Sequence, residues 1–107
     1  MTLDPDVLAA ATQFGLDPRL VQAVVNAEGN IVKAIQCSIP SITTRAQAID
    51  VLCRSAVHAM SDFVRTGHAA SFVSFWGARW APLGAANDPH GLNANWSKNV
   101  RQLWNEV

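Results

Sequence analysis

The chain has 107 residues, of which 50% are hydrophobic and 15% are charged, and its eight basic and eight acidic side chains give no formal net charge. This balance excludes an intrinsically disordered chain, and it offers no excess of Lys and Arg for binding a nucleic-acid backbone. A chain of this length can bury its own core, so we expect a single domain over residues 1–107.

Two Asp-Pro pairs predict the starts of the first two helices. Asp4 and Asp17 are suitable N-cap residues, and the proline after each suits the first helical position. The first helix is expected to end at Gly15 and the second at Gly29, since glycine favours helix C-caps. Residues 30–42 contain a proline and predict a short helical turn followed by a loop.

The clearest helical pattern follows Thr44, which forms a capping-box pair with Gln47. Apolar residues recur at spacings of three and four along residues 45–65, which predicts a long central helix. The residues of this stripe that we expect to be buried are Ile49, Cys53, Val57 and Met60.

The C-terminal third predicts a helix over residues 69–76 and then a long loop over 77–91, which contains three glycines and two prolines. A last helix is expected from about Leu92. No convincing strand pattern is present, so we predict an all-α fold, a compact helical domain built around its long central helix. The apolar face of the last helix is formed by Trp96, Val100, Leu103 and Trp104.

Glu28 ends the apolar stretch LVQAVVNAEGN, and the only other glutamate is Glu106. On a helix Glu28 shares a face with Val21 and Val24, so it is predicted to be the polar end of a buried stripe. A carboxyl group there loses hydration, which favours the protonated form that a general acid needs. The alternative is a solvated glutamate in the last turn of a helix.

Cys37 and Cys53 are the only cysteines, and we expect both to be reduced and to pack as small apolar residues in the core. The three histidines show no metal-ligand spacing with one another or with the cysteines. We therefore expect no metal and no cofactor.

Three stretches carry a resemblance to a known family: LVQAVVNAEGN, TTRAQAIDVLCRSAVHAM and FVSFWGARWAPLGAANDPHGLNANWSKNV. They resemble, in that order, the catalytic-helix end, the long helix that follows it, and the aromatic and "WAP" segment of soluble lytic transglycosylases and related lysozyme-like muramidases. The third stretch is similar to phage-type members. The chain lacks the Ser-x-x-Gly-x-x-Gln segment of the soluble transglycosylases and has no tyrosine for their tyrosine-bearing segment.

The resemblance implies a lysozyme-like domain that cleaves the β-1,4 bond between N-acetylmuramic acid and N-acetylglucosamine in peptidoglycan, with Glu28 as general acid and base. A lytic transglycosylase forms an anhydro sugar and needs no second carboxylate, unlike the usual pair of carboxylates in glycosidases. Asp50 and Asp62 are expected to be solvated, and Asp88 to cap a turn.

Four residues are candidates for substrate binding. Thr43 and Thr44 have helix capping as their alternative role, Trp80 has core packing, and Asn87 has an Asx turn. Several cations are possible contacts for carboxylates of the peptide stem, although single surface charges are expected to face solvent. They are Lys33, Arg45, Arg54 and Arg79.

The competing interpretation is a non-catalytic lysozyme-like helical module in a phage or secretion assembly, and the missing family segments favour it. The expected partner is a peptidoglycan glycan strand, with no nucleic acid and no membrane span, and a monomer in isolation. The acidic N-terminal stretch is not a signal peptide. If the resemblance holds, the location is the bacterial periplasm or cell wall, or a phage virion.

Overall fold

The computed structural model describes residues 2–66, 71–80 and 95–106. These ranges contain no strand, so the prediction of an all-α fold is confirmed. No helix within them is both long enough and apolar enough to cross a bilayer. The six described helices are α1 (Pro5–Phe14), α2 (Pro18–Glu28), α3 (Ile31–Gln36), α4 (Arg45–Thr66), α5 (Phe72–Trp80) and α6 (Trp96–Glu106).

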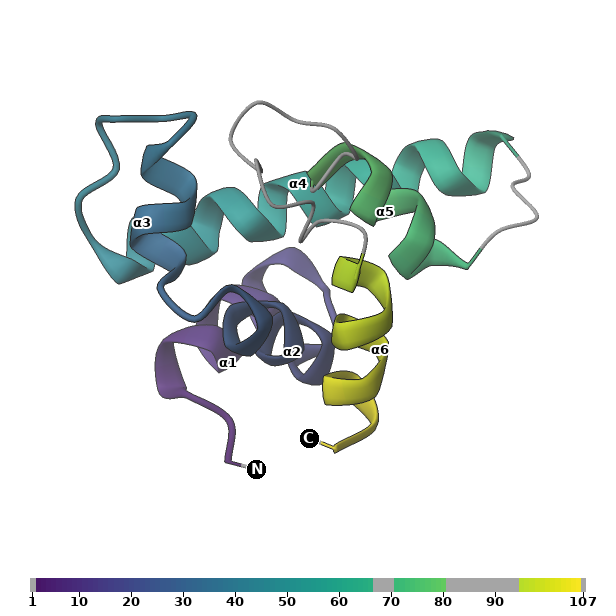
Figure 1. Ribbon diagram of the computed structural model, residues 1–107, viewed down its shortest axis with the longest axis horizontal. Helices are drawn as coiled ribbons and strands as arrows, with labels where there is room; N and C mark the ends of the chain where they lie inside the picture. The colour runs from purple at the N-terminus through teal and green to yellow at the C-terminus, as the bar shows by residue number, and fades with distance from the viewer. Residues whose placement is uncertain (1, 67–70, 81–94, 107) are drawn as a thin grey trace.

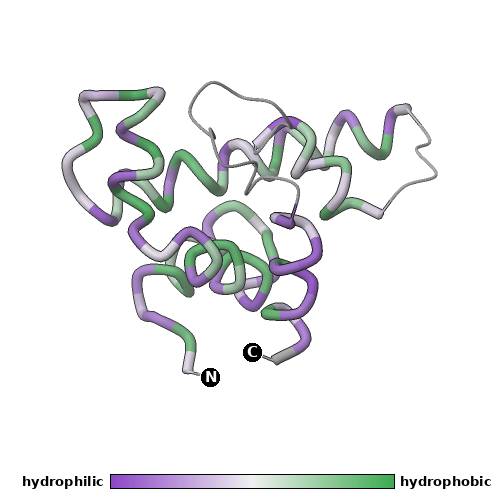
Figure 2. Tube along the Cα trace, viewed as in Figure 1, coloured by the Kyte–Doolittle hydropathy of each residue, from purple (hydrophilic) through white to green (hydrophobic). Residues whose placement is uncertain are grey.

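The long helix α4 crosses the molecule and packs against α1, α2, α3 and α5, whereas α6 packs against α2 and α5 (Figure 1). Helices α1, α2 and α6 lie together below α4 in this view, α3 lies at the N-terminal end of α4, and α5 packs on its C-terminal half. Because α2 lies between α1, α3 and α6, its apolar residues are enclosed, and Figure 2 shows green, hydrophobic stretches along it and along the other helices.

Helices α1 and α2 begin and end where the sequence predicts. Each begins at the proline after an aspartate, and Asp17 Oδ1 accepts a hydrogen bond from the backbone N–H of Arg19 at 2.9 Å. Each ends at a glycine with positive φ, 69° at Gly15 and 74° at Gly29. This backbone conformation strains residues that carry a Cβ, so these two glycines fix where the helices stop.

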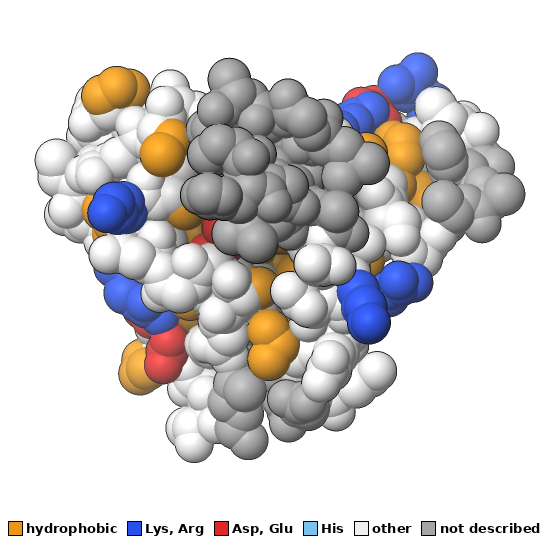
Figure 3. Space-filling view, in the orientation of Figure 1, with side chains coloured by type: hydrophobic (Ala, Val, Ile, Leu, Met, Phe, Trp, Pro, Cys, Tyr) orange, Lys and Arg blue, Asp and Glu red, His pale blue; other side chains and the backbone are white. Residues whose placement is uncertain are grey.

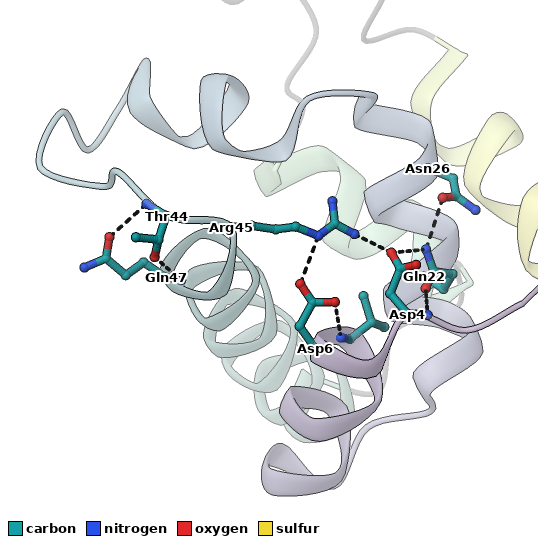
Figure 4. A network of polar contacts seen from close by, with 8 residues as sticks. Asp4, Asp6, Gln22, Asn26, Thr44, Arg45 and Gln47 are labelled. Carbon is teal, nitrogen blue, oxygen red and sulfur yellow. Dashed lines mark hydrogen bonds and ion pairs between the residues drawn. The ribbon is translucent and has the colours of Figure 1, made fainter.

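Asp4 does not cap α1 with its side chain but joins a polar network between three helices (Figure 4). Its backbone N–H donates to Oε1 of the buried Gln22 at 2.8 Å, and its carboxylate pairs with Arg45 at the start of α4. Arg45 Nε also contacts Asp6 Oδ2 at 2.9 Å. One arginine therefore ties α4 to the beginning of α1.

The capping box predicted at the start of α4 is present. Gln47 Oε1 accepts hydrogen bonds from the backbone N–H groups of Thr43 and Thr44 at 3.0 and 3.1 Å. In return, Thr44 Oγ1 accepts from the backbone N–H of Gln47 at 3.2 Å. These contacts satisfy backbone donors that a helix N-terminus would otherwise leave unpaired.

The core prediction for α4 is half right. Ile49 and Cys53 are fully buried, but Val57 and Met60 are 38% and 37% exposed. The buried face is centred on Ala48, Leu52, Ala56 and Ala59, and it continues through small alanines rather than through the larger apolar residues beside them. Small residues at a contact allow helices to approach closely, which explains why alanines occupy the buried face of α4.

Helix α5 begins and ends later than predicted, at Phe72 and Trp80 instead of residues 69 and 76. Gly77 was expected to open a loop but lies within the helix. A Cβ on Gly77 would lie 2.8 Å from Cε3 of Trp96, so this glycine allows α5 and α6 to pack closely. The rest of the predicted loop, and the start of the last helix near Leu92, lie outside the described residues.

Both cysteines are free thiols, but only Cys53 lies in the core, because Cys37 is exposed after the end of α3. Burial, and to a smaller extent the charge of Asp50, raises the pKa of the Cys53 thiol from 9.0 to about 11. Cys53 thus stays protonated at pH values where an ordinary thiol ionises, and thiolate is the reactive form.

We therefore expect iodoacetamide at pH 8 to label one cysteine of the native protein and both cysteines of the unfolded protein. Peptide mass spectrometry should place the native label on Cys37. Equal native labelling of both cysteines would contradict this assignment.

From pH 9 towards 11 the unfolded chain loses the Cys53 proton before the native chain does. The free energy of unfolding should therefore fall over this range, and it should fall more in the unmutated protein than in Cys53→Ala.

Candidate functional site

Glu28 is the last residue of α2, and its carboxylate accepts hydrogen bonds from two tryptophans far away in the sequence. Oε1 accepts from Trp80 Nε1 at 2.8 Å and from Trp96 Nε1 at 3.0 Å. The side chain is half-buried, and Gly29 turns the chain away immediately after it. The carboxylate is therefore fixed in position between α2, α5 and α6.

The two indole groups are themselves held by a third tryptophan. Trp76 is fully buried, its ring centre lies 6.1 Å from that of Trp80, and it meets Trp96 edge-on at 5.5 Å. Trp76 Nε1 donates to Ser55 Oγ on α4 at 3.0 Å, which fixes the ring at its polar edge. Edge-on and tilted aromatic pairs of this kind stabilise the packing beyond the area that they bury.

This geometry distinguishes the two oxygens of Glu28. Oε1 already accepts two N–H groups, and a protonated carboxyl group carries one O–H. Among the described residues, none donates a hydrogen bond to Oε2. When Glu28 is protonated, Oε2 is the oxygen available to carry the proton, while Oε1 keeps the group oriented.

Glu28 lies at the wall of an open pocket of about 420 Å³. Roughly 300 to 1,000 Å³ is typical of pockets that bind small ligands. The pocket combines apolar side chains with hydroxyl, thiol, guanidinium and carboxylate groups. Its described lining residues are Glu28 of α2, Ala34 and Ile35 of α3, Cys37, Ser38 and Ile39 after α3, Val51 and Ser55 of α4, and Arg79 and Trp80 of α5.

Glu28 is the only carboxylate among the described lining residues. Asp50 is paired with Arg54 at 2.8 Å, and Asp62 is paired with two arginines, so both are held in ion pairs outside this lining. Within the part of the chain that the structure describes, no group of three or more His, Cys, Asp and Glu residues could hold a metal ion. The described site therefore relies on one carboxylate.

Basic side chains do not form a continuous surface on the face shown in Figure 3, where the described Lys and Arg residues lie in separate small groups. A site for a nucleic-acid backbone needs a basic patch or stripe that follows the phosphates. The described part of this face has no such patch or stripe.

The structure brings together some of the predicted site residues. Trp80 contacts Glu28 directly, whereas Thr43 and Thr44 are exposed, form the capping box of α4 and do not line the described pocket. Asn87 lies outside the described residues. Sugar binding by the threonines and by Asn87 therefore stays a prediction.

Sequence reasoning missed Trp96, which it placed in the core. Trp96 is indeed only 7% exposed, yet its N–H group donates to Glu28. The signal that could have found it is chemical, because a buried indole N–H usually needs an acceptor. The acceptor lies 68 residues away in the sequence, so the sequence alone does not identify it.

The described residues define an all-α fold in which one oriented carboxylate lies at a ligand-sized pocket. No protein-family model, curated protein or solved structure matches this chain.

Proposed function

We propose that this chain cleaves the β-1,4 bond between N-acetylmuramic acid and N-acetylglucosamine in peptidoglycan, with Glu28 as its single general acid and base. One observation carries the proposal: the Glu28 carboxylate is held by two indole N–H groups at the wall of a pocket of about 420 Å³. Orientation of a catalytic carboxyl group in this way lowers the entropic cost of reaching the reacting atom.

The reaction needs one proton donor that later becomes a proton acceptor. Glu28 transfers the proton from Oε2 to the glycosidic oxygen, and the bond from this oxygen to C1 of the muramoyl residue breaks. The ionised carboxylate then takes the proton of the muramoyl 6-hydroxyl, whose oxygen attacks C1 and closes an anhydro ring. In a hydrolase, a water molecule takes the place of the 6-hydroxyl.

The composition of the pocket wall suits a sugar. Trp80, Ile35 and Val51 offer apolar surface to the C–H faces of a pyranose ring, and the Ser38 hydroxyl can bond to sugar hydroxyl or acetamido groups. The single carboxylate among the described lining residues favours the transglycosylase over hydrolases that use two carboxylates. Such pairs lie roughly 5 to 9.5 Å apart.

The test is digestion of purified peptidoglycan sacculi of several chemotypes, followed by mass spectrometry of the soluble fragments. We expect fragments that end in anhydro-muramic acid, which lack one water relative to reducing ends. Reducing ends would instead indicate a muramidase. If a folded sample releases no fragments from any chemotype, the non-catalytic helical module is the better description.

Trp80→Phe should lower the cleavage rate by about 10- to 100-fold, since a hydrogen bond to a charged group contributes about 1.5–3 kcal/mol. Phe keeps most of the ring but lacks the N–H group that orients Oε1. The matched control is Trp104→Phe, because Trp104 donates to Asp17 on the surface and not to Glu28. Equal losses in both variants would show that general destabilisation, and not the orientation of Glu28, limits the rate.

A further inference from the structure

Arg79 is the only cation among the described residues that line the Glu28 pocket. Its Nη1 lies 2.7 Å from Asp62 Oδ2, and its guanidinium carbon lies 4.7 Å from the centre of the Phe75 ring. The side chain is nevertheless 46% exposed. The guanidinium group is thus held in place from two sides and stays accessible at the pocket.

Asp62 does not pair with Arg79 only, because it also pairs with Arg65. Its Oδ1 accepts a hydrogen bond from Arg65 at 2.7 Å while Oδ2 contacts Arg79. The bonds from Arg65 and then Arg79 lower the pKa of Asp62, so this carboxylate is ionised near neutral pH. Two guanidinium groups and one carboxylate leave the trio with a net charge of +1, and Arg79 is its member at the pocket wall.

The alternative role of Arg79 is an ion pair that only ties α5 to α4. Exposed pairs of this kind contribute little to stability. A guanidinium group has five N–H donors in a fixed planar arrangement, and the contact with Asp62 is made by Nη1. Arg79 can therefore also bind a second, planar acceptor.

We propose that Arg79 binds a carboxylate of the ligand in the Glu28 pocket, an inference that rests on the proposed function because it places a peptidoglycan fragment there. Arg79 attracts this carboxylate from its place in the pocket wall. This attraction therefore sets the direction in which an anionic glycan lies in the pocket. An uncharged glycan would receive no such orientation.

Peptidoglycan offers this carboxylate from two sources. One is the lactyl group of muramic acid when no peptide is attached, and the other is the stem peptide, which is joined through the lactyl group and carries carboxylates of its own. Three ligands separate these sources: a disaccharide with a free lactyl carboxylate, the same disaccharide as its lactyl amide, and the same disaccharide with a stem peptide.

The experiment measures dissociation constants of the three ligands by titration calorimetry in a Glu28→Gln background, where no turnover consumes the ligand. At least one charged ligand should bind about tenfold more tightly than the amide, since a charge-assisted hydrogen bond contributes about 1.5 kcal/mol or more. Adding Arg79→Gln should remove this difference and leave the affinity for the amide unchanged. The ligand that loses affinity identifies the source of the carboxylate.

Arg54→Gln is the matched control, because Arg54 is paired with Asp50 and does not line the described pocket. It should keep the preference for the charged ligand. Equal loss of affinity for the amide and the charged ligands in Arg79→Gln would overturn the inference, as would equal affinities before the substitution or no binding of any ligand.

Cleavage by the protein with Glu28 intact is measured separately on sacculi. An Arg79-dependent preference for carboxylates without any cleavage would refute the proposed reaction and leave the inference standing. Cleavage together with an affinity that is insensitive to the ligand charge would refute the inference alone. Melting temperatures of all variants exclude unfolding as the cause of weaker binding.

Discussion

Glu28→Gln is expected to abolish glycan cleavage while the protein stays folded. Gln has nearly the same shape, and its amide oxygen can still accept the hydrogen bonds from Trp80 and Trp96. The group in place of Oε2 is an amide NH₂, which cannot transfer a proton to the glycosidic oxygen. General acid–base catalysis typically contributes about 10²–10⁴-fold, so release of soluble fragments from sacculi should fall by at least this factor.

The matched control for this variant is Asp50→Asn. Asp50 is also a carboxylate on a helix, but it lies in an ion pair with Arg54 and does not line the described pocket. The cleavage rate of Asp50→Asn should be close to that of the unmutated protein. Equal, non-zero rates for Glu28→Gln and the unmutated protein would remove Glu28 from the mechanism.

Trp76→Ala is expected to lower the free energy of unfolding more than any other of these variants. The side chain is fully buried between α4, α5 and α6, and replacing a buried Trp by Ala typically costs about 3–5 kcal/mol. That is a large part of the roughly 5–15 kcal/mol that stabilises a small domain. At about 4 °C per kcal/mol for this size, the melting temperature should fall by roughly 12 to 20 °C.

Val64→Ala provides the comparison, because Val64 lies on α4 and is 72% exposed. A surface substitution of this kind usually changes the free energy of unfolding by less than about 0.5 kcal/mol. Thermal unfolding followed by circular dichroism measures both variants. Similar melting temperatures for Trp76→Ala and Val64→Ala would show that Trp76 does not hold α5 and α6 together.

Local signals in the sequence predicted the starts and ends of the first helices because the interactions that set them are local. Asp17 accepts a hydrogen bond from the N–H group two residues later, and the two glycines with positive φ act at their own positions. The capping box of α4 likewise spans only four residues. Such elements are visible in a single sequence because their physics needs no knowledge of the rest of the fold.

The candidate site was only half predictable because its contacts are not local. Glu28 could be selected from its place in an apolar stripe, but its partners Trp80 and Trp96 lie 52 and 68 residues away. Periodicity describes one helix at a time and does not show which helices meet. The same limit explains Gly77, which the sequence presented as a helix breaker and which packing against Trp96 keeps within α5.

The contact between Glu28 and Trp96 has a consequence for the order in which the protein acquires its site. Helix α2 is synthesised before α6, and Trp96 is the first residue of α6. A nascent chain leaving the ribosome carries Glu28 with at most one of its two indole donors until residue 96 has been added and α6 has docked. Contacts over such long separations form slowly, so Glu28 becomes fully oriented only after α6 has been synthesised and has docked.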